Sequence, residues 1–589
     1  MSFTHDVART LLVCRASPRA PTLVLMIVDD FDYIVVGSGS AGAVLAARLS
    51  EDVRHSVLVL EYGGRDDGVV IQMPAACAIP MTRSRYDWGF MTDPEPGLGG
   101  RRIHQARGKV IGGTSSINGM CYVRGHAGDF DDWEARGCTG WGYRHVLPYF
   151  RRAESSAFGG DDYRGDGGPL HTCNGNGMAN PLHRALIEAG VEAGYPASDD
   201  VNGWRQEGFG RMDMTVHRGR RWSTANAYLK PALGRPNLRL EMHALTRRVL
   251  LDGRRAAGVE YEQGGAVKQA RARREVILAA GPVNSPKLLM LSGIGDGAQL
   301  AACGIDTLHH LPGVGTNLQD HLELWYQVAC TRPVTLNRHL NPLSKALIGL
   351  RWLLFRDGLG ASNQFESNGY IRSRAGLAFP DIQFHFIPVA MGFDGSSRFE
   401  GHGYQAHISP TKPASRGHVR LRSADPREAP SLLFNYLAEE EDRVTFRRAV
   451  RLTREIFAQP AFDPWRGREV LPGPEVVADD EIDAWVSGHA ETAYHPSCTC
   501  PMGTGPDAVV DPELRVHGVD ALRVVDSSIM PVITNGNLNA PTIMIGEMAS
   551  DMILGRTPLA PSNAAVGWVE DWQVRQRAGA AARPDPAAA

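Results

Sequence analysis

The chain has 589 residues, 43% of them hydrophobic and 22% charged, which is the composition of a globular protein with room for several domains. Its 62 basic and 65 acidic residues leave a net charge of −3, without the basic excess of a nucleic-acid-binding protein. Nine cysteines are too few for a disulfide scaffold, and no run reaches the roughly 20 apolar residues of a membrane-spanning helix. We therefore expect a cytoplasmic protein that is at most peripheral to the inner membrane.

The two ends of the chain are predicted to be flexible. Residues 1–30 contain a short apolar run without a cleavage site, so we interpret them as a leader, with Met26 as an alternative start to Met1. Residues 557–589 are rich in alanine and proline and are interpreted as a flexible tail.

A strand, a glycine turn and a helix are predicted between residues 31 and 49. Gly37, Gly39 and Gly42 form a G-x-G-x-x-G pattern that includes Ser40. Gly37 allows a sharp turn, Gly39 lets the backbone approach a pyrophosphate, and Gly42 lets the helix pack closely. A second strand ends at Glu61, which is placed to bind an adenosine ribose. This βαβ unit predicts a dinucleotide site, but NAD and FAD share the ADP half, so the pattern does not distinguish them.

Two later segments also predict a close approach between the backbone and a ligand. Residues 108–125 are rich in glycine and hydroxyl side chains, where the backbone must pass close to a flat or phosphorylated group. Residues 275–295 read as another strand, a glycine turn at Gly281 and a helix, which indicates a strand of the same sheet.

These segments resemble the glucose–methanol–choline (GMC) family of flavoprotein oxidoreductases. Two family signatures fit residues 108–131 and 281–295, and the resemblance covers about residues 30–555. It implies FAD and an α/β fold of two domains: a Rossmann-like FAD-binding domain with ββα-type insertions, and a substrate domain built on an antiparallel sheet with helices. The FAD-binding domain is expected over residues 31–170, 235–325 and 495–556, and the substrate domain over 171–234 and 326–494.

The resemblance also assigns residues to the flavin. It implies that the segment with Gly112, Gly113, Ser116 and Asn118 lines the isoalloxazine, and that Asp526 lies near the ribityl and pyrophosphate chain. Some family oxidases carry a histidine joined covalently to the flavin at the position of Ile117. Isoleucine cannot form that bond, so non-covalent FAD is expected.

Oxidation of an alcohol requires a base near the flavin, and histidine suits that task. His495 lies in the turn-rich segment Tyr-His-Pro-Ser-Cys, which matches the catalytic histidine motif of the family. The family places histidine or asparagine at the position of Asn539, which precedes a helical pattern and is expected to cap it. The nearby Cys498 and Cys500 are interpreted as packed thiols, and no metal site is predicted.

The substrate is the least determined feature. Residues 118–125, 360–366, 380–388 and 491–498 look most like the bacterial choline dehydrogenase branch, which oxidises choline to betaine aldehyde and passes electrons to a membrane acceptor. A quaternary ammonium needs aromatic rings or a carboxylate, and Phe365, Glu366 and Tyr494, with Trp88 as a further ring, are the candidates.

Several alternatives stay open at this point. An apolar pocket would suit aliphatic, aryl or polyether alcohols. The acceptor could be a quinone, another carrier or O2, and oligomerisation is left open. A flavin-containing hydroxynitrile lyase, which would use the same histidine without net oxidation, is a further reading.

Overall fold

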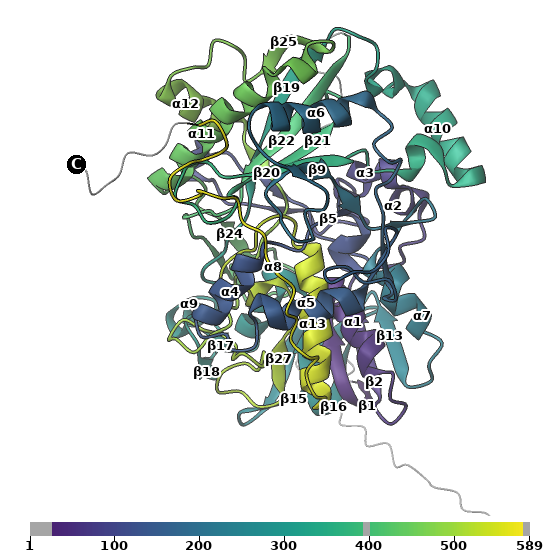
Figure 1. Cartoon of the computed structure of the whole chain (residues 1–589). Coiled ribbons are helices and arrows are strands. Elements are labelled where there is room, and N and C mark those ends of the chain that lie inside the picture. The colour runs from purple at the N-terminus through teal and green to yellow at the C-terminus, as the bar shows by residue number, and fades with distance from the viewer. Residues whose placement is uncertain (1–25, 393–400, 581–589) are drawn as a thin grey trace, which may run out of the picture.

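The computed structural model describes residues 26–392 and 401–580. Figure 1 shows two sheets in the molecule, one in its lower half and one in its upper half. Segments far apart in sequence alternate between the two halves, so each half is assembled from several pieces of the chain.

The lower sheet has the strand order β13-β2-β1-β16-β15-β14, and β27 also pairs with β16. The strands from β13 to β16 and β27 are parallel, and β15 and β14 continue the sheet as antiparallel strands. Strand β2 is entirely apolar before its final glutamate and is buried throughout, as expected of a parallel strand covered on both faces. The strands are β1 (Met26–Val36), β2 (Val57–Glu61), β13 (Leu238–Met242), β14 (Leu245–Asp252), β15 (Arg255–Gln263), β16 (Ala266–Leu278) and β27 (Leu522–Val524).

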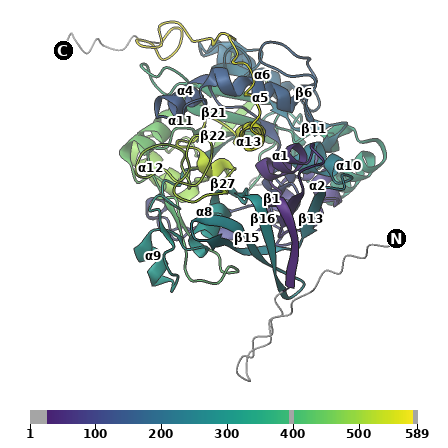
Figure 2. The ribbon, with the colours of Figure 1, turned by 90° about the horizontal axis from the view of Figure 1, so that it is seen from below.

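Helix α1 (Ser40–Leu49) connects β1 to β2, which confirms the βαβ unit expected from the sequence. Its residues are almost all buried because α13 (Asn539–Leu554), from the other end of the chain, packs beside it. Figure 2 shows the two helices side by side above the lower sheet. Helix α8 (Gly281–Leu291) follows β16, as the second strand-turn-helix pattern predicts.

The upper sheet has the order β25-β19-β22-β21-β20-β9-β8, with β26 paired to β19. The pairs that join β19, β22, β21, β20 and β9 are antiparallel, as expected of the substrate domain. Helices α6 (Pro181–Glu192) and α11 (Glu440–Phe457) pack against it. The strands are β8 (Ala197–Ser198), β9 (Gly208–Arg211), β19 (Leu322–Cys330), β20 (Ser367–Ile371), β21 (Ile382–Ile387), β22 (Gly403–Pro410), β25 (Arg466–Leu471) and β26 (Glu491–Thr492). The two domains predicted from the sequence follow this interleaving, but their boundaries stay a prediction.

Shorter elements complete the described chain. The remaining α-helices are α2 (Val69–Gln72), α3 (Ala78–Met81), α4 (Ala127–Ala135), α5 (Tyr143–Ala153), α7 (Lys230–Ala232), α9 (Gly297–Ala302), α10 (Pro342–Phe355) and α12 (Asp479–His489). Two-stranded ribbons are formed by β3 (Phe90–Met91) with β4 (His104–Gln105), β5 (Cys121–Tyr122) with β10 (Asp213–Met214), β6 (Glu154–Ser156) with β7 (Leu170–Thr172), β11 (Val216–His217) with β12 (Arg220–Arg221), β17 (Ile294–Gly295) with β18 (His309–His310), and β23 (His418–Arg420) with β24 (Ser431–Leu433).

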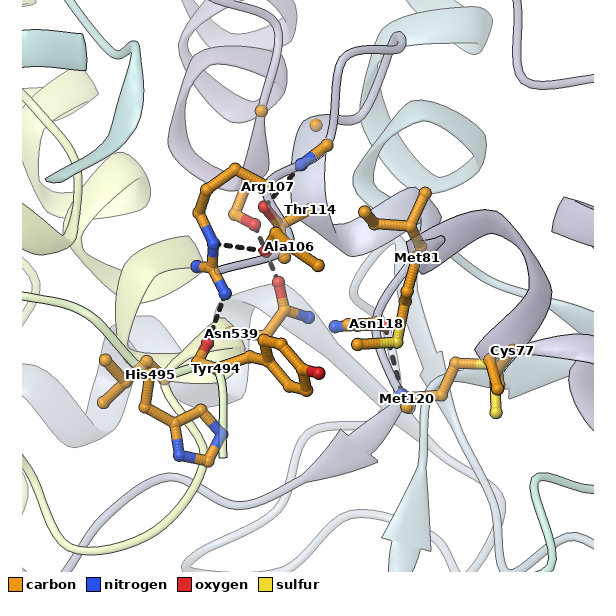
Figure 3. Close-up of a pocket in the computed structure, with 18 of the residues that line it drawn as sticks. Cys77, Met81, Ala106, Arg107, Thr114, Asn118, Met120, Tyr494, His495 and Asn539 are labelled. Carbon is orange, nitrogen blue, oxygen red and sulfur yellow. Dashed lines mark hydrogen bonds between the residues drawn. The ribbon is translucent and has the colours of Figure 1, made fainter. Parts of the chain in front are cut away.

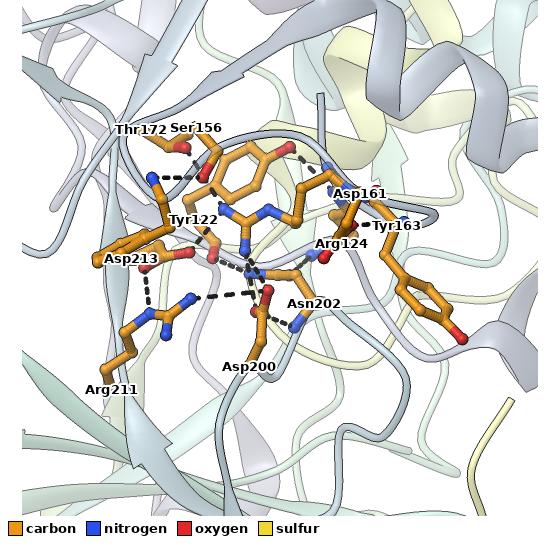
Figure 4. A network of polar contacts seen from close by, with 12 residues as sticks. Tyr122, Arg124, Ser156, Asp161, Tyr163, Thr172, Asp200, Asn202, Arg211 and Asp213 are labelled. Atoms are coloured by element: carbon orange, nitrogen blue, oxygen red, sulfur yellow. Dashed lines mark hydrogen bonds and ion pairs between the residues drawn. The ribbon is translucent and has the colours of Figure 1, made fainter. Parts of the chain in front are cut away.

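A buried network of ion pairs ties the segment around β6 to the segment that leads into the upper sheet (Figure 4). Arg164, only 3% exposed, pairs with Glu154, Asp200 and Asp213, each at 2.7 Å. Arg124 pairs with the other oxygen of Glu154 at 2.5 Å. Because buried charges are tolerated only when they are paired, this network fixes how the two segments meet.

The described ends of the chain lie against the body of the protein. Strand β1 begins at Met26, so residues 26–30 belong to the sheet rather than to the predicted leader. The described residues 557–580 contain no helix or strand but are held along the body by backbone hydrogen bonds, from Ser562 to Arg144 and from Gly567 to Trp204. The flexibility predicted for residues 557–589 stays a prediction. The parts of the leader and tail at 1–25 and 581–589 lie outside the described residues.

The close packing of α1 against the turn before it can be tested by adding one methyl group at Gly42. A Cβ atom on Gly42 would lie 2.0 Å from the Gly37 carbonyl oxygen, so Gly42→Ala must open the turn. We expect it to lower the free energy of unfolding by about 2 kcal/mol or more, measured by thermal or urea unfolding. Gly349→Ala, in α10, is the control, because its added Cβ meets no described atom within 4 Å and it should be neutral or slightly stabilising. Equal stability of the two variants would contradict the close packing.

Candidate active site

A cavity of about 1090 Å3 lies between the two sheets. Its walls come from the carboxyl ends of β1, β2 and β16, from the 106–121 segment, and from strands β19, β21 and β22 of the upper sheet. Ligands bind at the carboxyl ends of parallel strands in α/β sheets, and this cavity occupies that position.

The lower part of the cavity is a cradle of backbone that side chains would fill. A Cβ atom on Gly113 would lie 2.7 Å from the Gly39 Cα, and one on Gly37 would lie 2.5 Å from the Ala279 carbonyl oxygen. Gly37, Gly39 and Gly113 all line the cavity. The glycines therefore let three chain segments converge at one point and leave the space above them to a ligand.

The start of α1 and the end of β2 supply polar groups to this cradle. Gly39 is the N-cap of α1 and no side chain of the described residues caps the helix, so its first N–H groups are available to a phosphate. Ser40 lines the cavity, as does Glu61, whose carboxylate is held by Ser38 and by the Gly63 N–H at 2.7 Å. These groups fit the ADP half of a dinucleotide.

Three further residues predicted for the cofactor also line the cavity. Gly281 has a φ of +84° and donates its N–H to the Asp526 carboxylate at 2.9 Å. Asp526 also accepts hydrogen bonds from Ser285 and from the Ser528 N–H, so its orientation is fixed. Asn118 lines the opposite wall, where its side-chain oxygen accepts from Arg221 at 2.9 Å.

Three other predicted cofactor residues do not reach the cavity. Gly42 packs under the turn, as described above. Gly112 has a φ of +83° and donates its N–H to the Ser38 carbonyl, so it shapes the loop rather than lining the site. Ser116 is buried and donates its hydroxyl to the Ile111 carbonyl at 2.7 Å. The predicted contact of Ser116 with the ring system is therefore wrong, whereas the neighbouring Ile117 does line the cavity.

His495 lies on the cavity wall, and the segment around it is tightly held. Its backbone N–H donates to Asp320 at 2.7 Å, and Asp320 also accepts from the hydroxyls of Tyr436 and Thr492. The preceding residue, Tyr494, has a φ of +64°, and its carbonyl accepts from Arg107 at 2.6 Å (Figure 3). The sequence therefore identified a histidine that the fold presents to a cavity in one fixed position.

The hydrogen bonds around His495 define which of its ring nitrogens carries the proton. His321 Nε2 lies 3.1 Å from the Thr411 carbonyl, which only accepts, so His321 must donate from Nε2. In a neutral ring His321 Nδ1 is then an acceptor, and His495 Nδ1, 3.0 Å away, donates to it. This assignment leaves His495 Nε2 unprotonated, with a lone pair that faces Asn537 Nδ2 at 3.1 Å. Unprotonated Nε2 is the state required of a general base.

Burial keeps these rings neutral. It lowers the pKa of His321 to about 3 and that of His385, which contacts Asn537, to about 4. For His495, burial together with the positive charges of neighbouring groups, Arg107 among them, holds the pKa well below its ordinary value of 6.5. His495 is therefore unprotonated at neutral pH.

Two asparagines lie at the start of α13, and the sequence predicted a role for only one of them, Asn539. Asn539 is the first residue of α13, whose N-cap is Leu538, so the expected capping role is wrong. Its side-chain oxygen accepts from Ser40 at 2.8 Å, and its amide points into the cavity between Tyr494 and Asn118 (Figure 3). Asn537 is the asparagine that contacts His495. The sequence carries a signal for it only in its spacing, two residues before Asn539.

The predicted acid of the substrate pocket lies outside the cavity. The Glu366 carboxylate is buried, and it accepts hydrogen bonds from the N–H groups of Asn176 and Met178 and from the Ser362 hydroxyl. It therefore stabilises a loop, and the prediction that it contacts substrate is wrong. Phe365, the residue before it, does line the cavity.

In the part of the cavity formed by the upper sheet, the acid on the wall is Glu323, on β19, which sequence reasoning missed. Trp325 Nε1 and His407 Nδ1 each lie 2.8 Å from one of its carboxylate oxygens. Burial alone would raise its pKa, but the contact with His407 holds the pKa below its usual range. Glu323 is therefore a buried carboxylate in its charged form. The sequence does carry a signal for Glu323. Alternate residues of a strand share a face, so Glu323 and Trp325 could have been predicted to lie side by side.

Aromatic rings surround this carboxylate. Trp325 and His407 are direct cross-strand neighbours, and His385 pairs with His407 on the next strand. Phe365 packs edge-on against His407, with the ring centroids 5.3 Å apart. Tyr494 also lines the cavity, and burial and the charge of Glu323 raise the pKa of its phenol.

Trp88 lies at the other end of the cavity. It contacts the ring of Tyr62, the residue after Glu61, with centroids 5.0 Å apart. It is therefore part of the dinucleotide end and not of the aromatic wall around Glu323. Cys498 and Cys500 are buried free thiols within the described residues, as expected.

Comparison with known proteins decides the family. The GMC oxidoreductase models match residues 31–323 and 413–546, more than half of the chain. The chain belongs to the GMC oxidoreductase family. Its α/β fold of two domains, its FAD cofactor and its activity as an oxidoreductase on CH–OH donors, all expected from the sequence, are thereby confirmed.

Individual relatives match nearly the whole length of this chain. It is 57% identical over 551 residues to an oxygen-dependent choline dehydrogenase of Brucella canis, covering 93% of this chain and 100% of that protein. It is 55% identical over 557 residues to a protein of the same name from Photobacterium profundum, covering 94% and 98%. Among solved structures, pyridoxine 4-oxidase of Mesorbium loti is 34% identical with a TM-score of 0.81, covering 90% of this chain and 100% of that one.

The hydrogen bond from His495 to His321 can be tested by keeping or removing the acceptor. His321→Leu deletes it, so the His495 proton can move to Nε2, and we expect the rate of flavin reduction by alcohol to fall about a hundredfold or more. His321→Asn retains an oxygen near the position of Nδ1 and should recover a large part of the rate. Anaerobic stopped-flow absorbance measures both. Equal rates in the two variants would show that His321 acts only through packing.

Proposed function

We propose that this GMC oxidoreductase oxidises choline to betaine aldehyde. The observation that carries the proposal is the charged Glu323 carboxylate in an aromatic wall of the cavity that also contains His495. A quaternary ammonium has no hydrogen-bond donor, so a site recognises it by an anion and by ring faces, and Glu323, Trp325 and Phe365 supply both. The names of the relatives support the same substrate.

The residues of the chain provide the proton chemistry of this reaction. His495 Nε2 accepts the hydroxyl proton of the alcohol, because its other nitrogen is committed to His321. The amide of Asn537 has two hydrogens and can donate to Nε2 and to the substrate oxygen. Asn539, whose oxygen is held by Ser40, presents a second amide toward the cavity. FAD, when bound, supplies the acceptor for the hydride that leaves the alcohol carbon.

The cofactor and its electron acceptor complete the proposal. Ile117 has no nucleophilic atom, which supports non-covalent FAD. For the acceptor we propose a quinone or a similar carrier, with O2 as the second candidate because the relatives are named oxygen-dependent. No helix in the described ranges 26–392 and 401–580 is long and apolar enough to cross a membrane.

An anaerobic titration tests the reaction. Choline should bleach the main flavin absorption band of the purified protein. If only other alcohols bleach the flavin, the protein oxidises alcohols but choline is not its substrate. If no alcohol bleaches the flavin, the result favours a hydroxynitrile lyase. Formation of H2O2 on admission of air then distinguishes O2 from a carrier as the acceptor.

The ammonium site is tested by two glutamates of which only one lines the cavity. Glu323→Gln removes the charge, so we expect the KM for choline to rise about tenfold or more, while the KM for 3,3-dimethyl-1-butanol, its uncharged isostere, changes little. Glu366→Gln is the matched control, because it changes a buried acid outside the cavity. The ratio of the two KM values is the readout, since a loss of stability alone would not move it. An unchanged ratio in Glu323→Gln would contradict the assignment.

A further inference from the structure

Helix α10 presents an apolar stripe to solvent, the reverse of an ordinary surface helix. Leucines recur at positions 343, 347, 350 and 354, which lie on one face of the helix, and each is more than half exposed. Trp352 is the only fully buried residue of the helix, and it points the opposite way. Its indole donates to the Gly219 carbonyl at 2.6 Å and anchors the helix.

The stripe is part of a larger apolar face. Leu353 and Phe355 are also exposed, at 46% and 69%, so six large apolar side chains on 14 residues meet water. Helix α10 projects from the edge of the molecule in Figure 1 and contacts mainly the single turn at 358–361 that follows it. Contiguous apolar surface of this kind marks a site of interaction.

Basic side chains are exposed on α10 and on the segments next to it. The segment 331–360 contains five basic residues and only one acidic residue, Asp357, which is paired with Arg351. Arg218 and Arg220 extend the basic surface, because they flank Gly219, to which α10 is anchored. The exposed basic residues of this surface are Arg218, Arg220, Arg332, Arg338, Lys345 and Arg351. An apolar stripe edged by positive charge is complementary to the interface of a bilayer with anionic lipids.

The same helix borders the mouth of the active-site cavity. Lys345 and Ile348 of α10 line the cavity, as do Leu336, His339 and Leu340 just before it. A molecule that rests on the apolar stripe would therefore lie next to the opening that leads to the flavin site.

We propose that α10 is a membrane-docking helix: its leucine stripe enters the interface of an anionic bilayer, which brings the cavity lined by the other side of the helix close to the lipid. A lipid-soluble electron acceptor can then reach the site without crossing water. The docking stands on the surface alone, whereas this delivery of an acceptor rests on the proposed function.

The test uses the full-length holoenzyme and vesicles. The protein should sediment with vesicles of phosphatidylcholine and phosphatidylglycerol, bind much less to phosphatidylcholine alone, and be released by salt. The triple variant Leu347→Glu/Leu350→Glu/Leu354→Glu should lose vesicle binding by about tenfold or more. These exposed side chains are not among those lining the cavity, so flavin content and choline-dependent reduction of a soluble dye should not change.

A matched triple variant controls for the added charge. Val53→Glu/Val191→Glu/Leu308→Glu places the same charges on exposed apolar residues away from α10 and should bind vesicles as the wild type does. Wild-type protein that ignores anionic vesicles, or two triple variants that bind equally, would overturn the proposal.

The oligomeric state without lipid separates the bilayer from a second copy of the chain. Sedimentation velocity should give the same state for the wild type and the α10 triple variant. A wild-type oligomer that this variant dissociates would identify the stripe as a contact between copies and overturn docking to a bilayer. Because vesicle binding and sedimentation velocity need no choline turnover, their failure is distinguishable from failure of the proposed reaction.

Discussion

The convergence of three backbone segments at the carboxyl ends of β1 and β16 is the constraint on which the rest of the structure depends. Gly39 and Gly113 approach so closely that a single Cβ would separate them, and Gly37 meets Ala279 in the same way. Two of these segments are about 75 and 240 residues from the first. Their contact fixes the floor of the cavity, and it places the start of α1 where a phosphate is stabilised.

Desolvation then determines what the cavity can do. His321, His385 and His495 are buried together, so each is held neutral, and their hydrogen bonds can run in only one direction, toward the Thr411 carbonyl. Glu323, also buried, is a charge that Trp325 and His407 stabilise by hydrogen bonds. A neutral base and a fixed anion in one cavity suit an alcohol that carries a positive charge.

The surface of α10 obeys a different constraint from the core. Trp352 anchors the helix to the body, and the opposite face has no partner among the described residues. Exposed leucines lower the solubility of a protein. The six large apolar side chains of α10 therefore fit a surface that contacts lipid.

The sequence by itself determined the βαβ unit, the family and His495, because these depend on local spacing and on residues close together in the chain. It could not decide which candidate side chains face the cavity. Pairing of β19 with β22 directs Glu323 to the cavity, whereas a loop holds Glu366 outside it. Of the two asparagines, Asn539 is held by Ser40 and Asn537 contacts His495. The partners of His495 are residues 320, 321 and 537, which only the folded chain brings together. The tertiary structure therefore determines which ring nitrogen of His495 carries the proton.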